Sequence, residues 1–261
     1  METQQIIQSL SYVTWVLLGG LALGSFGLTW LLRQVTDATS GFVGFSGVLA
    51  AVIGLGWLWT EWSLPAPTEL AIESGAAFDE PRRAAIALFV MLALVAGVQL
   101  RRGGRALWLG AIALVGGVAA LYLGGWGWGG GEPIGVSYFV QLLALTAITG
   151  GSMAAVVLAH WYLVTPKISE RPLVLTTQLL MVVLVVQLLL FGVWLAAGIP
   201  DLEPFEALTG DNMLFVWLRL VVGLLFPLLL TAMAYRTAVS YTHLTLPTNT
   251  NACRSGGGAG Q

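Results

Sequence analysis

One arginine lies inside a long apolar run, where its charge requires a partner. Arg219 is near the start of the run 212–234, and a guanidinium at membrane depth costs several kcal/mol unless it is paired or reaches the interface. Glu61 is the expected partner, with Asp211 and Glu206 as alternatives. Such a pair would line a pocket open to the outside. It would either join two helices or offer a cation to a substrate anion or a quinone carbonyl.

Further polar residues fall within two neighbouring runs. Thr149 and Ser152 lie in the middle of the run 136–164, and Gln187 lies in the next run. Close helix packing explains these side chains, and a polar substrate site at mid-membrane is the alternative. His160 lies at the inner end of its run. Its imidazole could sit in the interfacial belt, donate a hydrogen bond to a quinone or another ligand, or serve as an axial haem ligand.

The residue types exclude several other chemistries. The single lysine, Lys167, lies in a loop, which excludes a retinal Schiff base within a helix. Two histidines and one cysteine cannot build a Cys₄ zinc site, a cysteine-ligated iron–sulfur cluster or a disulfide framework, so no metal site is expected. The net charge of −2 does not suggest a nucleic-acid partner. No nucleophile–base pair is visible, so an enzyme acting on lipids is the least supported class.

Composition predicts a polytopic membrane protein. Hydrophobic residues make up 57% of the chain and charged residues 9%, against about 25% charged residues in soluble domains. We expect an all-α transmembrane bundle of seven spans, each long enough to cross the hydrocarbon layer. The spans are 9–32, 42–62, 84–100, 106–126, 136–164, 173–199 and 212–234. The Gly-rich segment 124–131 is expected to be a flexible interfacial loop, with Trp126 and Trp128 at headgroup depth.

The charges between the spans predict an orientation. With the N-terminus outside, seven basic residues fall on one side, against Arg82 and Arg83 on the other; the seven are Arg33, Arg101, Arg102, Arg105, Lys167, Arg171 and Arg236. The positive-inside rule makes the seven-residue side cytoplasmic, in a bacterial inner membrane. Most acidic residues then lie outside. That bias reflects either the avoidance of basic residues in exported loops or a face that attracts cations or a basic partner.

A shift of 131 positions aligns three consecutive elements without a gap. Gly19-Gly20 falls on Gly150-Gly151, and Trp30 falls on Trp161. The spacing predicts a parallel tandem repeat of two four-helix units within a membrane domain of residues 1–239. The first unit covers 9–126 and the second covers 136–234. The fourth helix of the second unit would fall at 237–257, where the chain is polar, so we expect that an eighth helix has been lost.

The segment 240–261 is polar, rich in Thr and Gly, and expected to be disordered. Its stretch 239–248 resembles translated sequencing-adapter read-through. His160-Trp161-Tyr162-Leu163 with Pro166, and Trp217-Leu218-Arg219 with Gly223 and Pro227, resemble signatures of bacterial integral membrane proteins with about eight helices. The resemblance covers two spans and implies no activity.

Two functions follow from these patterns. The first is a membrane subunit that binds a quinone or a lipid-like ligand, together with a redox or membrane-complex partner protein. The second is a permease for a small cationic or zwitterionic solute, based on the repeat and the polar mid-membrane residues. The ligand-binding residues expected from the sequence are Arg219, Glu61, His160, Gln187, Ser152 and Thr149.

Overall fold

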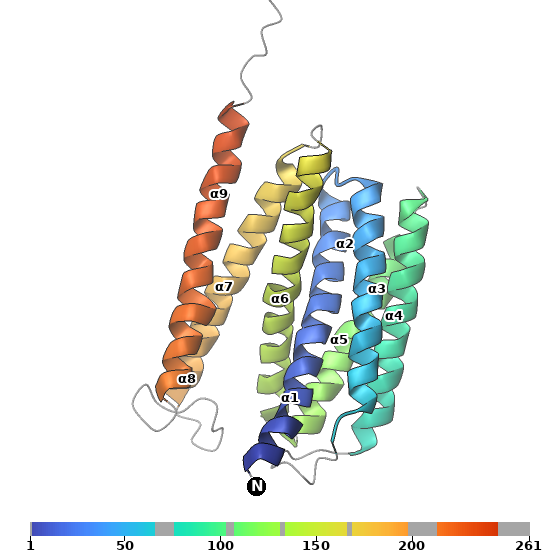
Figure 1. Ribbon diagram of the computed structural model, residues 1–261, viewed down its shortest axis with the longest axis vertical. Coiled ribbons are helices and arrows are strands. Elements are labelled where there is room, and N and C mark those ends of the chain that lie inside the picture. Colours follow the sequence, from blue (N-terminus) through green and yellow to red (C-terminus); the bar gives the residue numbers. More distant parts are fainter. Residues whose placement is uncertain are drawn as a thin grey trace, which may run out of the picture.

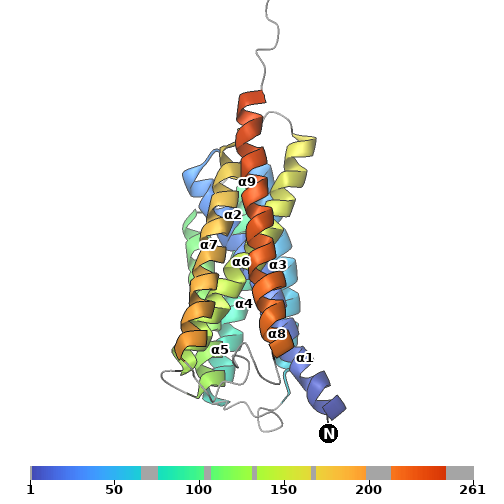
Figure 2. The same cartoon turned by 90° about the vertical axis from the view of Figure 1, so that its left-hand side faces the viewer.

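The computed structural model describes residues 2–65, 76–102, 107–130, 134–165, 169–197 and 213–244. Within them, seven helices are long and apolar enough to cross a membrane. They run roughly along one common direction (Figures 1 and 2). The prediction of an all-α polytopic bundle is confirmed, and the seven apolar helices fit an integral membrane protein.

The helices begin and end close to the predicted spans. The first span is continuous through α1 (Glu2–Gly19), the π-helical turn η1 (Gly20–Gly24) and α2 (Ser25–Val35), and α3 is Ser40–Trp62. A short 3₁₀ turn η3 (Ala76–Phe78) precedes α4 (Asp79–Arg101), followed by α5 (Leu107–Gly129), α6 (Ile134–Val164) and α7 (Arg171–Ala197). The last span contains α8 (Met213–Leu218), the π-helical η5 (Arg219–Leu225) and α9 (Phe226–Leu244).

Two predictions about helix ends need correction. The Gly-rich segment is not a loop, because α5 continues to Gly129 and ends at Gly130, which has φ 68°. The glycines permit this close packing: a Cβ on Gly125 would lie 2.7 Å from the backbone nitrogen of Phe139 on α6. At the other end of the chain, α9 extends to Leu244, so residues 240–244 of the supposedly disordered segment are helical. Residues 245–261 lie outside the described part.

Small residues let several of the helices pack closely. A Cβ on Gly47 of α3 would lie 2.8 Å from the Cα of Gly97 on α4. The first span crosses α6 at Gly24 and Gly150, where a Cβ on Gly24 would lie 2.9 Å from the Cα of Gly150. Large buried side chains, among them Trp15, Trp57 and Phe89, fill the core between the first span, α3 and α4.

The last span stands at one edge of the molecule and packs on α7, while α3 and α4 stand at the opposite edge (Figure 1). Pro227 has no N–H and its ring would collide with the carbonyl of the residue four positions earlier in a regular α-helix. The wider π-helical turn over η5, just before Pro227, relieves that collision.

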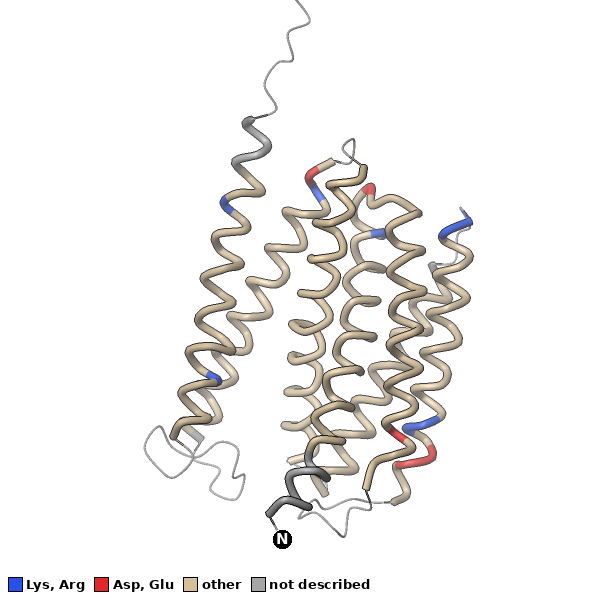
Figure 3. The backbone as a smooth tube through the Cα atoms, viewed as in Figure 1, with Lys and Arg blue, Asp and Glu red and all other residues tan. Residues whose placement is uncertain are grey.

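Charged residues gather at the two ends of the bundle (Figure 3). Arg33 lies in the last turn of α2, Arg101 in the last turn of α4 and Arg171 at the start of α7, all at the end away from the N-terminus. At that end the Ser169 hydroxyl donates a 2.6 Å hydrogen bond to Asp37. This hydrogen bond, with one from its own backbone, lowers the pKa of the exposed Asp37 carboxyl below its ordinary value.

Candidate ligand pocket beside a buried ion pair

A buried ion pair joins α3 to α4 at the N-terminal end of the bundle. Arg82 Nη2 lies 2.8 Å from Glu61 Oε1, and Arg82 Nε lies 3.0 and 2.9 Å from Oε1 and Oε2. Glu61 is 1% exposed and Arg82 is 3% exposed. Trp15 of α1 donates its indole N–H to Glu61 Oε2 at 2.6 Å. Both carboxylate oxygens therefore have charged or polar donors, as a buried carboxylate requires.

The local sequence explains why Arg82 faces inward. α4 begins at Asp79, before the predicted span, so Arg82 is the fourth residue of this helix and does not lie in a loop. Asp79 accepts a 2.9 Å hydrogen bond from Arg82 Nη2 in an i,i+3 arrangement, and an acidic side chain is favourable at a helix N-terminus. The guanidinium thus donates hydrogen bonds to two carboxylates, that of Glu61, which is buried, and that of Asp79, which is partly exposed.

An aromatic shell encloses the ion pair. The Arg82 guanidinium lies 5.3 Å from the ring centre of Trp128 on α5, a cation–π geometry. Trp15 packs edge-on against Trp57 and Trp128 at 5.2 and 4.7 Å, and Tyr12 packs edge-on against Trp128 at 5.3 Å. Trp128 is therefore half-buried against the hydrophobic core, where its ring covers the Arg82 guanidinium.

A pocket of about 520 Å³ adjoins this shell between α1, α5 and α6. Tyr12 and Trp128 belong to both the shell and the pocket, and Tyr138, Gln141 and Thr149 of α6 bring further polar groups. None of the described side chains that line the pocket is charged. An apolar cavity with a few polar groups is the usual form of a small-molecule site.

The mouth of the pocket is flanked by exposed apolar side chains. Val13 and Leu17 form part of its wall and are 60% and 49% exposed. Gln141, by contrast, is only 8% exposed, so its amide lies at the inner side. A ligand that enters between Val13 and Leu17 would come from the hydrocarbon layer and would meet its hydrogen-bonding groups at the inner end.

The predicted pair of Arg219 with Glu61 is wrong. Arg82 and Trp15 occupy the Glu61 carboxylate, while Arg219 lies on η5, with its guanidinium 5.7 Å from the ring centre of Phe191 on α7. The helices that carry the two residues stand at opposite edges of the bundle (Figure 1). Glu61 and Arg82 belong to adjacent antiparallel helices, so their side chains meet without any rearrangement of the backbone. The other suggested partners, Asp211 and Glu206, lie outside the described residues.

The remaining predicted site residues are not brought together. Thr149 lines the pocket. Ser152 and His160 are exposed on α6. Gln187 is buried on α7, and its Nε2 has no hydrogen-bond partner among the described residues. Of these four residues, Thr149 lines the pocket, and Ser152, His160 and Gln187 are not among the residues that line it.

Sequence reasoning missed Arg82, Tyr138 and Gln141. One signal was available for Arg82: Asp79 precedes it by three residues, a spacing that favours a shared helical turn over a loop. Tyr138 and Gln141 carry no such signal, because a single Tyr or Gln within an apolar run looks the same whether it faces lipid or a pocket.

No family model, curated protein or solved structure matches this chain.

Proposed function

We propose that this protein is a membrane subunit that binds a neutral, lipid-soluble ligand with oxygen acceptors, for which a quinone is the best chemical fit. The observation that carries the proposal is the pocket between α1, α5 and α6, whose described lining residues are uncharged, with Tyr138 and Gln141 on its wall and exposed apolar side chains at its mouth. Hydroxyl and amide groups can donate hydrogen bonds to quinone carbonyls, and the apolar wall suits a ring and its tail.

A partner protein is part of the proposal. With a single cysteine, this sequence cannot ligate an iron–sulfur cluster through cysteines, so electrons exchanged with a bound quinone would pass to a partner that carries the redox centre. The buried ion pair behind Trp128 supports a holding role, because it fixes the Trp128 ring that forms one wall of the pocket.

The pocket gives less support to a permease for a cationic or zwitterionic solute. Such a solute would need a charged or strongly polar site reached from water, whereas the described residues that line this pocket carry no charge and the pocket opens among exposed apolar side chains. Of the polar mid-membrane residues on which the permease hypothesis depends, Thr149 lines the pocket, and Ser152 and Gln187 do not.

Binding of decyl-ubiquinone to the full chain in nanodiscs tests the proposal. Quinones quench tryptophan fluorescence, and Trp128 lies in the pocket wall, so we expect saturable quenching. Gln141→Leu should raise the Kd about fivefold to tenfold, the equivalent of one lost hydrogen bond of about 1–1.5 kcal/mol. Tyr138→Phe should raise it by a smaller factor.

Two matched variants serve as controls. Gln187→Leu removes another buried Gln outside the pocket, and Tyr235→Phe removes a hydroxyl that accepts a 3.4 Å hydrogen bond from Gln178 on α7. Neither should change the Kd more than about twofold. Quenching that does not saturate, or that weakens equally in all four variants, would contradict the proposed site.

We also propose the orientation with the N-terminus outside a bacterial inner membrane, and an origin as two four-helix units with a further helix after the last span. The basic residues at the ends of α2 and α4 and at the start of α7 support the orientation. In a Cys253→Ser background, an impermeant maleimide added to intact cells should label Ser63→Cys and not Ser169→Cys. The reverse labelling would invert the orientation.

A further inference from the structure

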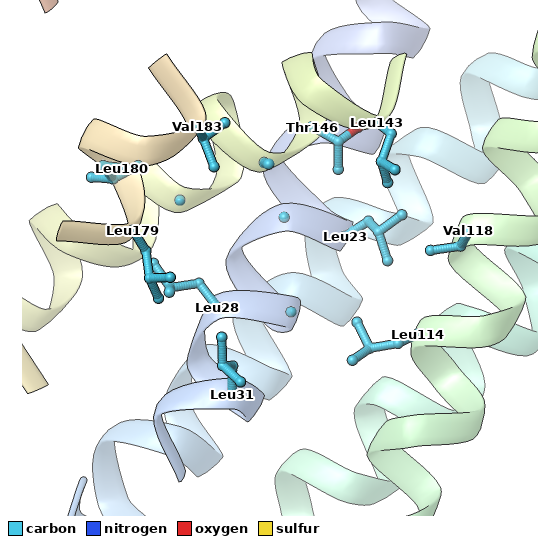
Figure 4. Close-up of a pocket in the computed structure, with 14 residues that line it drawn as sticks. Leu23, Leu28, Leu31, Leu114, Val118, Leu143, Thr146, Leu179, Leu180 and Val183 are labelled. Carbon is cyan, nitrogen blue, oxygen red and sulfur yellow. The ribbon is translucent and has the colours of Figure 1, made fainter. Parts of the chain in front are cut away.

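A second pocket lies deeper in the membrane, where the first span, α5, α6 and α7 meet (Figure 4). Its volume is about 250 Å³. Leu114 and Val118 of α5 face Leu179 and Leu180 of α7 across the side chains of the first span (Figure 4). It is separate from the proposed ligand pocket, because the crossing of Gly24 with Thr146 and Gly150 lies between the two.

The chemistry of this second pocket restricts what can fill it. Among the described residues that line it, only Thr146 has a polar side chain, and Thr146 is 4% exposed. A water molecule needs two to four polar partners, so this cavity does not hold water well. Leaving it empty is also unfavourable, because the lining atoms would lose their dispersion contacts.

The rim of the cavity indicates what lies beside it. The rim contains Leu31 and Leu143, which are 36% and 40% exposed, so the cavity opens sideways between apolar side chains. Leu31 and Leu143 both lie within helices long and apolar enough to cross a membrane, so the cavity opens toward the hydrocarbon of the bilayer.

We propose that this pocket is a binding site for one hydrocarbon chain of a membrane lipid. The lipid chain fills the space between α5 and α7 and contacts the first span, so it links α7 to α5. Among the described elements, α7 packs mainly on α6 and α9, with smaller contacts to α2 and η5. This inference does not depend on the quinone proposal, because it concerns a different cavity and a ligand without polar groups.

Photo-crosslinking with a diazirine-labelled phosphatidylcholine in nanodiscs tests the site. The label is placed near the middle of the acyl chain, and the labelled positions are located by mass spectrometry. In the wild-type full chain we expect labelling at Leu31, Leu143 and Leu179 to exceed labelling at lipid-facing positions of α9, such as Leu229, by at least fivefold. Equal labelling of all these positions would mean that only bulk lipid is present, which would overturn the proposal.

A variant that fills the cavity provides the second test. A Cβ on Gly27, a pocket residue, would meet only the side-chain end of Leu114 at 3.3 Å, so Gly27→Leu can extend into the space. The excess labelling at the rim should disappear, while labelling of Leu229 stays unchanged. Gly56→Leu on α3 is the matched control, because its Cβ likewise meets one Leu side-chain end, at 3.4 Å, outside the pocket.

A second filling variant keeps the test decisive if Gly27→Leu does not fold. Ala147→Leu enters the same cavity from α6 and should remove the same excess labelling. Excess labelling that persists in a folded filling variant, or that is also lost in Gly56→Leu, would show that the lipid chain is not held in this cavity.

Discussion

Two arginines near the N-terminal end of the bundle have opposite surroundings. Arg82 is buried, bonded to Glu61 and Asp79 and covered by Trp128. Arg219 is only partly buried on the last span and lies over the ring of Phe191. A charged side chain within a membrane costs several kcal/mol of free energy unless it is paired or reaches the interface. The neighbouring helices, rather than depth alone, therefore decide which groups surround such a charge: two carboxylates and the Trp128 ring at Arg82, and the Phe191 ring among the contacts of Arg219.

The same contrast extends to the packing around each arginine. In an apolar stretch of 18 residues within α3, 50% of the residues are buried, whereas 11% are buried in a stretch of the same length within the last span. Close glycine contacts join α3 to α4, whereas a Cβ on Gly192 of α7 would meet nothing within 4 Å. Substitutions should therefore be costly in the first region and mild in the second.

The largest effect is expected from breaking the Arg82–Glu61 pair. Arg82→Leu leaves the Glu61 carboxylate buried without its cation, which should lower the free energy of unfolding by about 3–5 kcal/mol. Equilibrium unfolding in mixed micelles measures this change. The double variant Arg82→Leu with Glu61→Leu should recover much of the loss, because no charge then remains buried. A single variant as stable as wild type would show that the pair is not desolvated.

The helices could be predicted from the sequence because a membrane span needs a long apolar run, and each of the seven runs became a helix. The partner of Glu61 could not be predicted, because depth in the membrane favours Arg219, and Arg82 stands before its apolar run, where the sequence predicts a loop. The composition of the Gly-rich segment 124–131 likewise predicts a loop. Its helix depends on contacts with α6, such as that of Gly129 with Gly135, which composition does not reveal.

Glycine substitutions test the difference in packing between the two regions. A Cβ on Gly150 would collide with the backbone of Ser25 and Gly24, so Gly150→Ala should destabilise the protein by about 1–3 kcal/mol. Gly192→Ala should stabilise it by up to about 1 kcal/mol, because alanine is the better helix former and the position is open. The same unfolding assay compares the two variants. A similar change in both would contradict the difference in packing.

The coupling between Arg219 and Phe191 should be smaller. A double-mutant cycle with Arg219→Leu and Phe191→Leu isolates this pair, and a cation–π contact at a partly exposed site contributes about 0.5–1 kcal/mol. The corresponding cycle for Arg82 and Glu61 should give several times that coupling. Comparable couplings in the two cycles would remove the distinction between the two arginines.

The smallest effect is expected at the end of the bundle away from the N-terminus, where a hydrogen bond joins the segment after α2 to the segment before α7. Ser169, just before α7, donates to Asp37, just after α2, and lowers the pKa of that carboxyl. A lowered folded-state pKa contributes stability above the unfolded pKa of about 3.9, and that contribution is lost as the pH falls through the folded value. Ser169→Ala should therefore lower the Tm slightly at pH 6, and the difference from wild type should shrink by pH 3. Ser63→Ala, which removes a donor to the backbone carbonyl of Thr60, should show no such pH dependence, since that carbonyl does not titrate. If the two variants shift the Tm by the same amount at both pH values, the Asp37 carboxylate does not contribute to joining the loops.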